Sequence, residues 1–201
     1  MRLPKVRELG EAISAIFGRR FTTRFPAVPV EVPERYRGKP EFNLDRCIGC
    51  GACVNACPTE ALTMLDDPSA QPPFRRLTLR WDRCIFCGNC SENCTTTDGV
   101  TLSRQWDLAG MDRSAMSEDH TFELVLCQRC GAVVGTKKHI IWLCQRLGPL
   151  LYSNPTLLLV NQADVLGGLP QGPVRRDQQP EVGDFVQVLC PRCRYQLNIS
   201  F

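Results

Sequence analysis

The residues of this chain that could do chemistry are above all its cysteines, which recur in two copies of one spacing. Thirteen of the 201 residues are cysteine, several times the usual share. In both copies two, two and three residues separate successive cysteines, and the copies are offset by 37 positions. The first run is Cys47, Cys50, Cys53 and Cys57, and the second run is Cys84, Cys87, Cys90 and Cys94. Four thiols in so short a segment are typical of iron–sulfur ligation.

The spacing within each run is that of bacterial ferredoxins with two 4Fe-4S clusters. Three thiolates on a tight loop can hold three irons of one cluster. The fourth cysteine, expected at the start of a short helix, points away and binds the other cluster. Gly51 and Gly88 lie between the second and third cysteines, where the missing Cβ lets backbone amides approach the cluster sulfides. The first predicted ligand set is therefore Cys47, Cys50, Cys53 and Cys94, and the second is Cys84, Cys87, Cys90 and Cys57.

Disulfides, buried reduced thiols and zinc ligation are the alternative interpretations of these eight cysteines. The N-terminal sequence lacks the features of a secretion signal, and thiols inside cells are kept reduced. The odd number of cysteines also argues against complete pairing. Zinc sites usually combine cysteine pairs that a longer loop separates. We therefore expect an intracellular chain that carries two 4Fe-4S clusters.

Two further CxxC pairs lie in the C-terminal half with 59 residues between them, and strand-like segments at 122–126 and 185–189 precede them. Four thiolates make a closed tetrahedral site that suits one structural zinc, with rubredoxin-like iron as the alternative and unmetallated thiols as a third interpretation. Cys144, on a predicted helix over 137–147, is expected to be an ordinary buried cysteine. The predicted metal ligands are Cys127, Cys130, Cys190 and Cys193.

Short elements must position the cluster ligands. Alternating apolar residues predict strands at 61–65 and 77–81, and proline-rich turn chemistry joins them over 66–76. So small a core needs its clusters to fold. We predict an α+β fold, namely a bacterial two-cluster 4Fe-4S ferredoxin-like module with an N-terminal amphipathic helical arm and a small C-terminal zinc-ribbon-like or rubredoxin-like segment. The predicted domains are the arm at 1–40, the ferredoxin module at 41–105 and the four-cysteine metal-binding segment at 106–201.

The arm is basic and amphipathic. Residues 1–40 carry nine Lys and Arg against four Glu, whereas the whole chain has a formal net charge of +3. A proline-rich stretch over 26–33 would hold the arm away from the ferredoxin core, so we expect docking on a membrane-embedded subunit, with packing on its own domain as the alternative. No aromatic-interleaved basic motif indicates nucleic acid. The apolar stripe of the arm consists of Val6, Leu9, Ile13, Ile16 and Phe17.

Residues 36–58, YRGKPEFNLDRCIGCGACVNACP, and the second run, DRCIFCGNCSENC, carry a family resemblance. They closely resemble the two-cluster ferredoxin subunit of formate hydrogenlyase-type membrane-bound hydrogenases. The peripheral-arm subunit of respiratory complex I with two 4Fe-4S clusters is a more distant relative, and the C-terminal CxxC pairs favour the hydrogenase subunit. One departure is that Thr95 follows Cys94, where the family usually has a proline such as Pro58.

The resemblance implies an electron-relay subunit between a donor subunit and a NiFe catalytic subunit. It implies a peripheral position on the cytoplasmic side of the inner or cell membrane, beside a membrane-embedded subunit. The chain has no nucleotide-binding glycine loop and no serine, histidine and acid constellation, and its two histidines, His120 and His139, do not stand at ligand spacing. We therefore predict no catalytic residue of its own. The alternatives are a complex I-type NADH/quinone oxidoreductase subunit, a freely diffusing soluble ferredoxin, and a scaffold without electron flow.

Overall fold

The computed structural model describes residues 6–19, 22–163, 168 and 185–200. The chain divides into two compact units, residues 1–36 and 37–201. The predicted boundaries after residues 40 and 105 stay predictions. Among the described residues, every helix is too short or too polar to cross a lipid bilayer.

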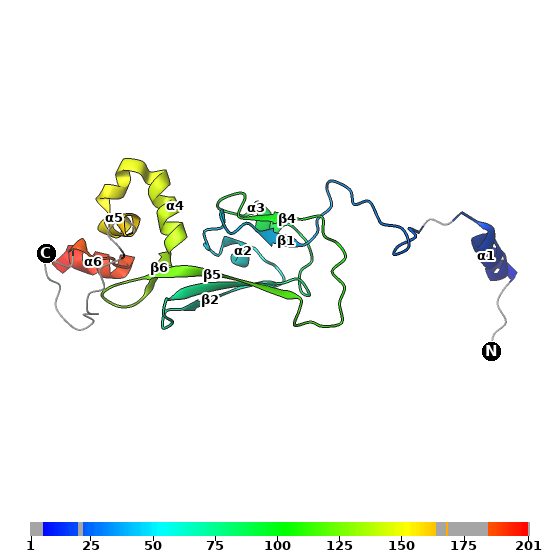
Figure 1. Ribbon diagram of the computed structural model, residues 1–201, viewed down its shortest axis with the longest axis horizontal. Coiled ribbons are helices and arrows are strands. Elements are labelled where there is room, and N and C mark those ends of the chain that lie inside the picture. Colours follow the sequence, from blue (N-terminus) through cyan, green and yellow to red (C-terminus); the bar gives the residue numbers. More distant parts are fainter. Residues whose placement is uncertain (1–5, 20–21, 164–167, 169–184, 201) are drawn as a thin grey trace. The chain divides into compact units, whose positions relative to one another are not determined.

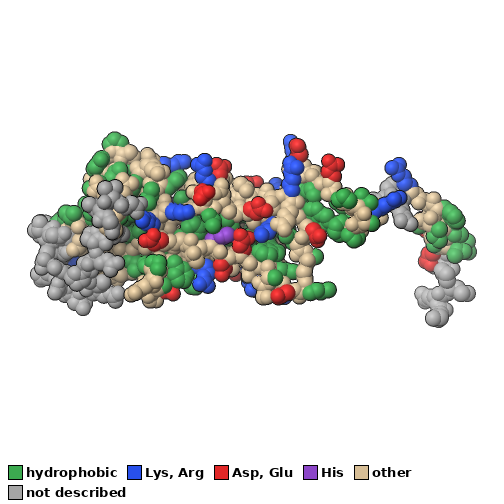
Figure 2. Space-filling model, viewed as in Figure 1, with side chains coloured by type: hydrophobic (Ala, Val, Ile, Leu, Met, Phe, Trp, Pro, Cys, Tyr) green, Lys and Arg blue, Asp and Glu red, His purple; other side chains and the backbone are tan. Residues whose placement is uncertain are grey.

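The first unit contains α1 (Val6–Phe17), the amphipathic helix that the sequence predicts. Its apolar residues recur every three or four positions, so one face of the helix is apolar. No residue of α1 is buried, and Phe17 keeps 86% of its surface exposed. Figure 2 shows hydrophobic side chains gathered over this helix.

The second unit is built on two antiparallel sheets (Figure 1). The small sheet pairs β1 (Pro40–Phe42), which precedes the first cysteine run, with β4 (Val100–Leu102), which follows the second run. The larger sheet has the order β2-β3-β5-β6. Its strands are β2 (Leu62–Asp67), β3 (Phe74–Arg80), β5 (Ser117–Leu126) and β6 (Val133–Thr136).

The strands β2 and β3 confirm the two strands predicted over 61–65 and 77–81, and they pair as a hairpin, with longer strands and a shorter connection than predicted. Leu62 pairs with Leu79 and Asp67 with Phe74, so the turn spans only 68–73. Leu77 and Leu79 are fully buried on one face of β3, as their alternation predicts.

Each cysteine run contains a four-residue helix, α2 (Ala52–Asn55) or α3 (Asn89–Glu92). Gly51 and Gly88 precede these helices with φ of 82° and 89°, a left-handed conformation that favours glycine. The expectation that the fourth cysteine starts a helix is wrong, because Cys57 and Cys94 follow α2 and α3. The left-handed glycine makes each helix begin five residues before the fourth cysteine, so the third cysteine lies on the helix instead.

Strand β5 connects the ferredoxin-like part to the C-terminal part. Residues 117–123 pair with β3, and residues 124–126 pair with β6. Figure 1 shows it as the long strand that reaches the base of α4. The two ends of one strand therefore contribute to different parts of the unit.

The C-terminal part is mainly helical, with α4 (Lys137–Leu147), a 3-10 helix η1 (Gly148–Ser153), α5 (Pro155–Gln162) and α6 (Pro191–Ser200). Helix α4 confirms the helix predicted over 137–147. The strand predicted over 185–189 is wrong: residues 185–186 form a 3-10 turn and residues 187–190 are irregular. The backbone there bonds to Gln128 and to side chains instead of to a strand. The N–H of Gln128 donates to Val188 O, and Gln128 Oε1 accepts from Val188 N, both at 2.8 Å. Thr156 and Arg194 bond to the backbone of the neighbouring residues.

Candidate metal centres

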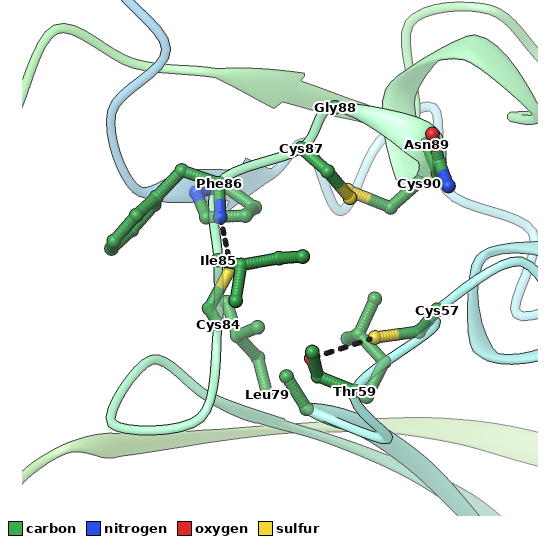
Figure 3. Close-up of a pocket in the computed structure, with 13 residues that line it drawn as sticks. Cys57, Thr59, Leu79, Cys84, Ile85, Phe86, Cys87, Gly88, Asn89 and Cys90 are labelled. Carbon is green, nitrogen blue, oxygen red and sulfur yellow. Dashed lines mark hydrogen bonds between the residues drawn. The ribbon is translucent and has the colours of Figure 1, made fainter.

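The eight cysteines of the two runs lie around two cavities, each lined by three cysteines of one run and the last cysteine of the other. The first cavity holds about 290 Å³ of empty space, partly open to solvent, and is lined by Cys47, Cys50, Cys53 and Cys94. The second holds about 350 Å³ and is lined by Cys84, Cys87, Cys90 and Cys57. Figure 3 shows the second cavity, with Cys57 opposite the loop of the second run. The cysteines are thus grouped in the two predicted sets.

Gly99 shows how closely the two runs approach each other at the first cavity. A Cβ on this residue would lie 3.1 Å from Cys94 Sγ and 3.2 Å from the Cα of Cys47. It would also meet the Thr96 hydroxyl at 2.7 Å, closer than real Cβ atoms come. A glycine here lets the last cysteine of the second run pack against the first cysteine of the first run.

Side chains from other elements hold the loop of the first run by its carbonyl oxygens. Arg75 Nη1, on β3, donates to Gly49 O at 2.9 Å, and Lys138 Nζ, on α4, donates to Leu44 O at 2.6 Å. The hydroxyl of Thr136, at the end of β6, donates to the carbonyl oxygen of Ile48, the residue before Gly49. The loop that carries the first ligand set is therefore fixed by the C-terminal part as well as by the sheet.

Hydroxyl and amide groups lie beside the cysteine sulfurs. In the second set, the Phe86 N–H donates to Cys84 Sγ at 3.4 Å, and Thr59 Oγ1 lies 3.8 Å from Cys57 Sγ. In the first set, two threonines that follow Cys94 make such contacts. Thr95 Oγ1 lies 3.3 Å from Cys50 Sγ, and Thr96 Oγ1 lies 3.5 Å from Cys94 Sγ.

The C-terminal cysteine set, Cys127, Cys130, Cys190 and Cys193, converges although its two pairs are far apart in sequence. Its four Sγ atoms all lie within 4.8 Å of one another, and no other group of possible ligands in the described part of the chain is gathered in this way. Three of the four residues are buried.

Two different local structures supply this set. Cys127 follows β5 in a tight turn, in which the Gly131 N–H donates to Cys127 O and the Cys127 N–H donates to Ala132 O, both at 2.8 Å. The second pair sits at the start of α6, where Cys193 lies on the helix. Burial raises the pKa of Cys127, but backbone hydrogen bonds outweigh it and lower the value to about 7. Burial and the neighbouring thiols raise the pKa of Cys193.

Residues 46–98 match the family model of the 4Fe-4S dicluster domain. The chain carries a 4Fe-4S dicluster domain. It is 37% identical over 122 residues to formate hydrogenlyase subunit 6 of Escherichia coli (strain K12), which is 59% of this chain and 64% of that protein.

Two other proteins match this chain over shorter segments. F(420)H(2) dehydrogenase subunit I of Methanosarcina mazei is 34% identical over 65 residues, which is 32% of this chain and 37% of that protein. NAD(P)H-quinone oxidoreductase subunit I of Microcystis aeruginosa is 39% identical over 54 residues, 25% of this chain and 28% of that protein. The chain thus spans less than two thirds of each of these relatives. The predicted resemblance to the formate hydrogenlyase-type subunit, and more distantly to the complex I-type subunit, is confirmed.

Among solved structures, the membrane-bound sulfane sulfur reductase, an archaeal respiratory membrane complex, contains a similar chain. The similarity has a TM-score of 0.39 at 23% identity and covers 58% of this chain and 61% of that chain.

The cavities of the dicluster domain fit iron–sulfur ligation. Burial, together with the neighbouring thiols, raises the pKa of Cys53 to about 12 and that of Cys90 to about 11. Such thiols keep their protons at neutral pH unless a metal displaces them. Burial opposes ionisation of Cys57 and Cys94 too, but their hydrogen bonds outweigh it and lower their pKa values. Cysteine-only, largely shielded donor sets of this kind suit 4Fe-4S clusters.

The other cysteine and the two histidines considered as possible ligands lie outside these sets. Cys144 is buried on α4, as predicted, and its Sγ donates to Leu157 O at 3.5 Å. His120 packs against the Phe42 ring at 4.8 Å between centroids, and His139 lies 6.1 Å from the Trp142 ring. In the described residues, neither histidine joins a group that could hold a metal.

The sequence analysis missed the groups that support the ligands. Thr95 had a visible signal, because it stands where the first run has Pro58, a residue with neither an N–H nor a hydroxyl. Thr136, Lys138 and Arg75 had none, since only the fold brings them to the loop of the first run.

Proposed function

We propose that this protein is a non-catalytic electron-relay subunit of an oxidoreductase complex. The observation that carries the proposal is the crossed grouping of eight cysteines around two neighbouring cavities, which supplies four thiolates to each. A 4Fe-4S cluster with four cysteine ligands takes up and releases one electron. The apolar residues around the sulfurs shield them from water, and the backbone amides stabilise their negative charge.

We assign the ligands of the dicluster domain accordingly. The first cluster is held by Cys47, Cys50, Cys53 and Cys94. The second cluster is held by Cys84, Cys87, Cys90 and Cys57. Each cluster then joins both runs, so that cluster binding also stabilises the fold of the domain.

The C-terminal cysteine set is proposed to hold one structural zinc, with rubredoxin-like iron as the alternative. The four sulfurs already converge around one point, and four thiolates leave no open position for a substrate. Because the set joins the end of β5 to the start of α6, the metal would cross-link the helical part to the sheet. The zinc-ribbon-like character of the segment is part of this proposal.

The proposed partners are a NiFe catalytic subunit and a membrane-embedded subunit of a formate hydrogenlyase-type complex. The match to formate hydrogenlyase subunit 6 covers 59% of this chain, against 32% and 25% for the other two relatives, and therefore favours this complex over a complex I-type one. The exposed apolar face of α1 would dock on the membrane-embedded subunit, on the cytoplasmic side of the membrane. A freely diffusing ferredoxin has no need of such a face.

Anaerobic purification of the native complex through a tag on this chain tests the proposal. We expect hydrogenase subunits to copurify with a chain that has both clusters, and the double variant Leu9→Asp, Ile13→Asp to lose these partners while keeping its iron. Replacing Glu8 and Glu11 by Gln, on the polar face of the same helix, is the matched control. A fully loaded wild-type chain that elutes alone contradicts the subunit assignment, and NADH- or quinone-linked partners would favour the complex I-type alternative.

A further inference from the structure

Several hydrogen-bond donors to the ligand sulfurs occupy equivalent positions in the two halves of the dicluster domain. The donors correspond at the repeat offset of 37 positions, which is what a duplicated segment would provide. The matched pairs are Gly49 on Cys47 with Phe86 on Cys84, and Thr59 on Cys57 with Thr96 on Cys94. These shared donors cannot make one cluster differ from the other.

Cationic side chains are matched as well. Lys138 Nζ donates to a carbonyl oxygen of the first loop, at Leu44, and Arg37 Nη1 donates to one of the second loop, at Cys87, at 2.8 Å. The first loop also accepts a hydrogen bond from Arg75, but the charge of that side chain is paired with Asp66. Besides this ion pair, each loop therefore has one cation hydrogen-bonded to one of its carbonyl oxygens. Lys138 and Arg37 therefore do not distinguish the two ligand sets.

One side-chain donor breaks the symmetry. Pro58 follows the last cysteine of the first run and has no hydrogen to donate, whereas Thr95 holds the equivalent position in the second run. The Thr95 hydroxyl lies 3.3 Å from Cys50 Sγ, 45 residues away in sequence. A sulfur bound to iron is a thiolate without a proton, so the hydroxyl must be the donor.

The additional donor acts on one set only. Cys50 belongs to the first ligand set, although Thr95 itself follows a cysteine of the second run. A reduced cluster carries one more negative charge than an oxidised one, so a donor to its sulfur stabilises the reduced form more. The direction of the effect is therefore a higher reduction potential.

We propose that the Thr95 hydroxyl makes the cluster held by Cys47, Cys50, Cys53 and Cys94 the more easily reduced of the two. One electron from an external donor then resides mainly on the first cluster, and the cluster of the second run is the lower-potential site. The inference rests on the proposed cluster ligation. It assigns to Thr95 a tuning role that its equivalent, Pro58, cannot have.

A potentiometric titration followed by electron paramagnetic resonance tests the inference on the anaerobically purified complex. We expect two one-electron steps, and Thr95→Val should move the upper one to lower potential. The expected change is about three- to tenfold in the ratio of reduced to oxidised cluster, which is about 28 to 59 mV. Thr95→Ser should restore the wild-type value, because it keeps the hydroxyl. Thr95 is exposed, so Thr95→Ala removes the same group without dependence on how valine packs.

Thr59→Val is the matched control, because its hydroxyl lies beside Cys57 of the second set. It should leave the upper step in place. An unchanged upper step in both Thr95→Val and Thr95→Ala, an equal shift of both steps, or a shift of the lower step alone overturns the inference. Iron and sulfide analysis separates this from the proposed function: a chain that lacks both clusters refutes the ligation itself, whereas a loaded chain with unmoved potentials refutes only the role of Thr95.

Discussion

The hydroxyl of Thr136 donates a hydrogen bond to the carbonyl oxygen of Ile48, 88 residues away in sequence and inside the first cysteine run. The same hydroxyl accepts a hydrogen bond from the His139 N–H at 3.2 Å and so caps α4. Thr136 has no exposed surface, and Ile48 keeps only 6% of its own. One buried side chain therefore couples the start of the C-terminal helices to the loop that carries Cys47 and Cys50.

Replacing Thr136 by Val should destabilise the second unit and loosen the first cluster in particular. It leaves a buried carbonyl and a helix N–H without their partner, which costs about 1–3 kcal/mol. A domain of this size then unfolds about 2–4 °C lower per kcal/mol. Anaerobic thermal melts, followed by the loss of cluster absorbance, measure this change.

Thr136→Ser is the control for this prediction, because it keeps the hydroxyl. It should retain most of the stability. If the valine variant melts like the wild type, the hydrogen bond to Ile48 does not hold the loop.

Replacing Cys57 by Ser should damage the cluster of the second run, although Cys57 belongs to the first run. The reason is that Cys57 lines the cavity of Cys84, Cys87 and Cys90. Paramagnetic resonance of the dithionite-reduced protein should show loss of one of the two signals. Cys94→Ser should remove the other signal. The crossed assignment fails if the two variants lose the same signal or if Cys57→Ser removes the first-run cluster.

Replacing Cys190 by Ser should remove the zinc and leave the iron in place. Its Sγ lies 3.6 Å from Cys130 Sγ, and three thiolates bind zinc less tightly than four. Metal analysis of the purified protein should show about one zinc per chain in the wild type and much less in the variant. Cys144→Ser, a buried cysteine outside every set, should keep both metals. Equal zinc in the wild type and the Cys190 variant argues against the site.

Replacing Arg75 by Gln should weaken the attachment of the first loop to the sheet. Arg75 binds Asp66 through two nitrogens, at 2.7 and 2.8 Å, and reaches Gly49 O with a third. Both ion-pair side chains are mostly shielded, with 11% and 26% of their surfaces exposed, so loss of the arginine should cost about 1–3 kcal/mol. Melting temperature and the rate of iron loss to a chelator measure the effect.

Arg83→Gln changes an exposed arginine elsewhere in the dicluster domain and serves as the control. Its melting temperature should stay within about 1 °C of the wild type, because exposed substitutions rarely change stability by more than about 0.5 kcal/mol. If the two variants behave alike, the contacts of Arg75 contribute nothing beyond a surface charge.

The local patterns of the sequence were sufficient for the grouping of the cysteines around the two cavities and for several elements. The helix over 137–147 follows from its apolar residues, and the strands β2 and β3 follow from alternation on either side of a proline-rich turn. The pairing of Cys57 with the second run also follows from spacing, because the geometry of such a run is nearly independent of the rest of the chain. The helix and the strands depend on residues close in sequence, and the cysteine grouping depends on the duplication of one short motif.

Features that depend on distant contacts could not be predicted. The approach to Cys190 reads as a strand by composition, but the backbone of Val188 bonds to Gln128 instead of to a strand. The contacts of Thr136 and Arg75 with the first loop join residues 88 and 26 positions apart. Nothing in the types of these residues indicates such partners.

Iron, acid-labile sulfide and reduced-state paramagnetic resonance, determined together on the anaerobically purified protein, test the central claim most directly. We predict about eight iron and eight sulfide per chain and two interacting signals after dithionite reduction, as expected for two four-iron clusters in one small domain. A colourless preparation with no sulfide and no signal would contradict it.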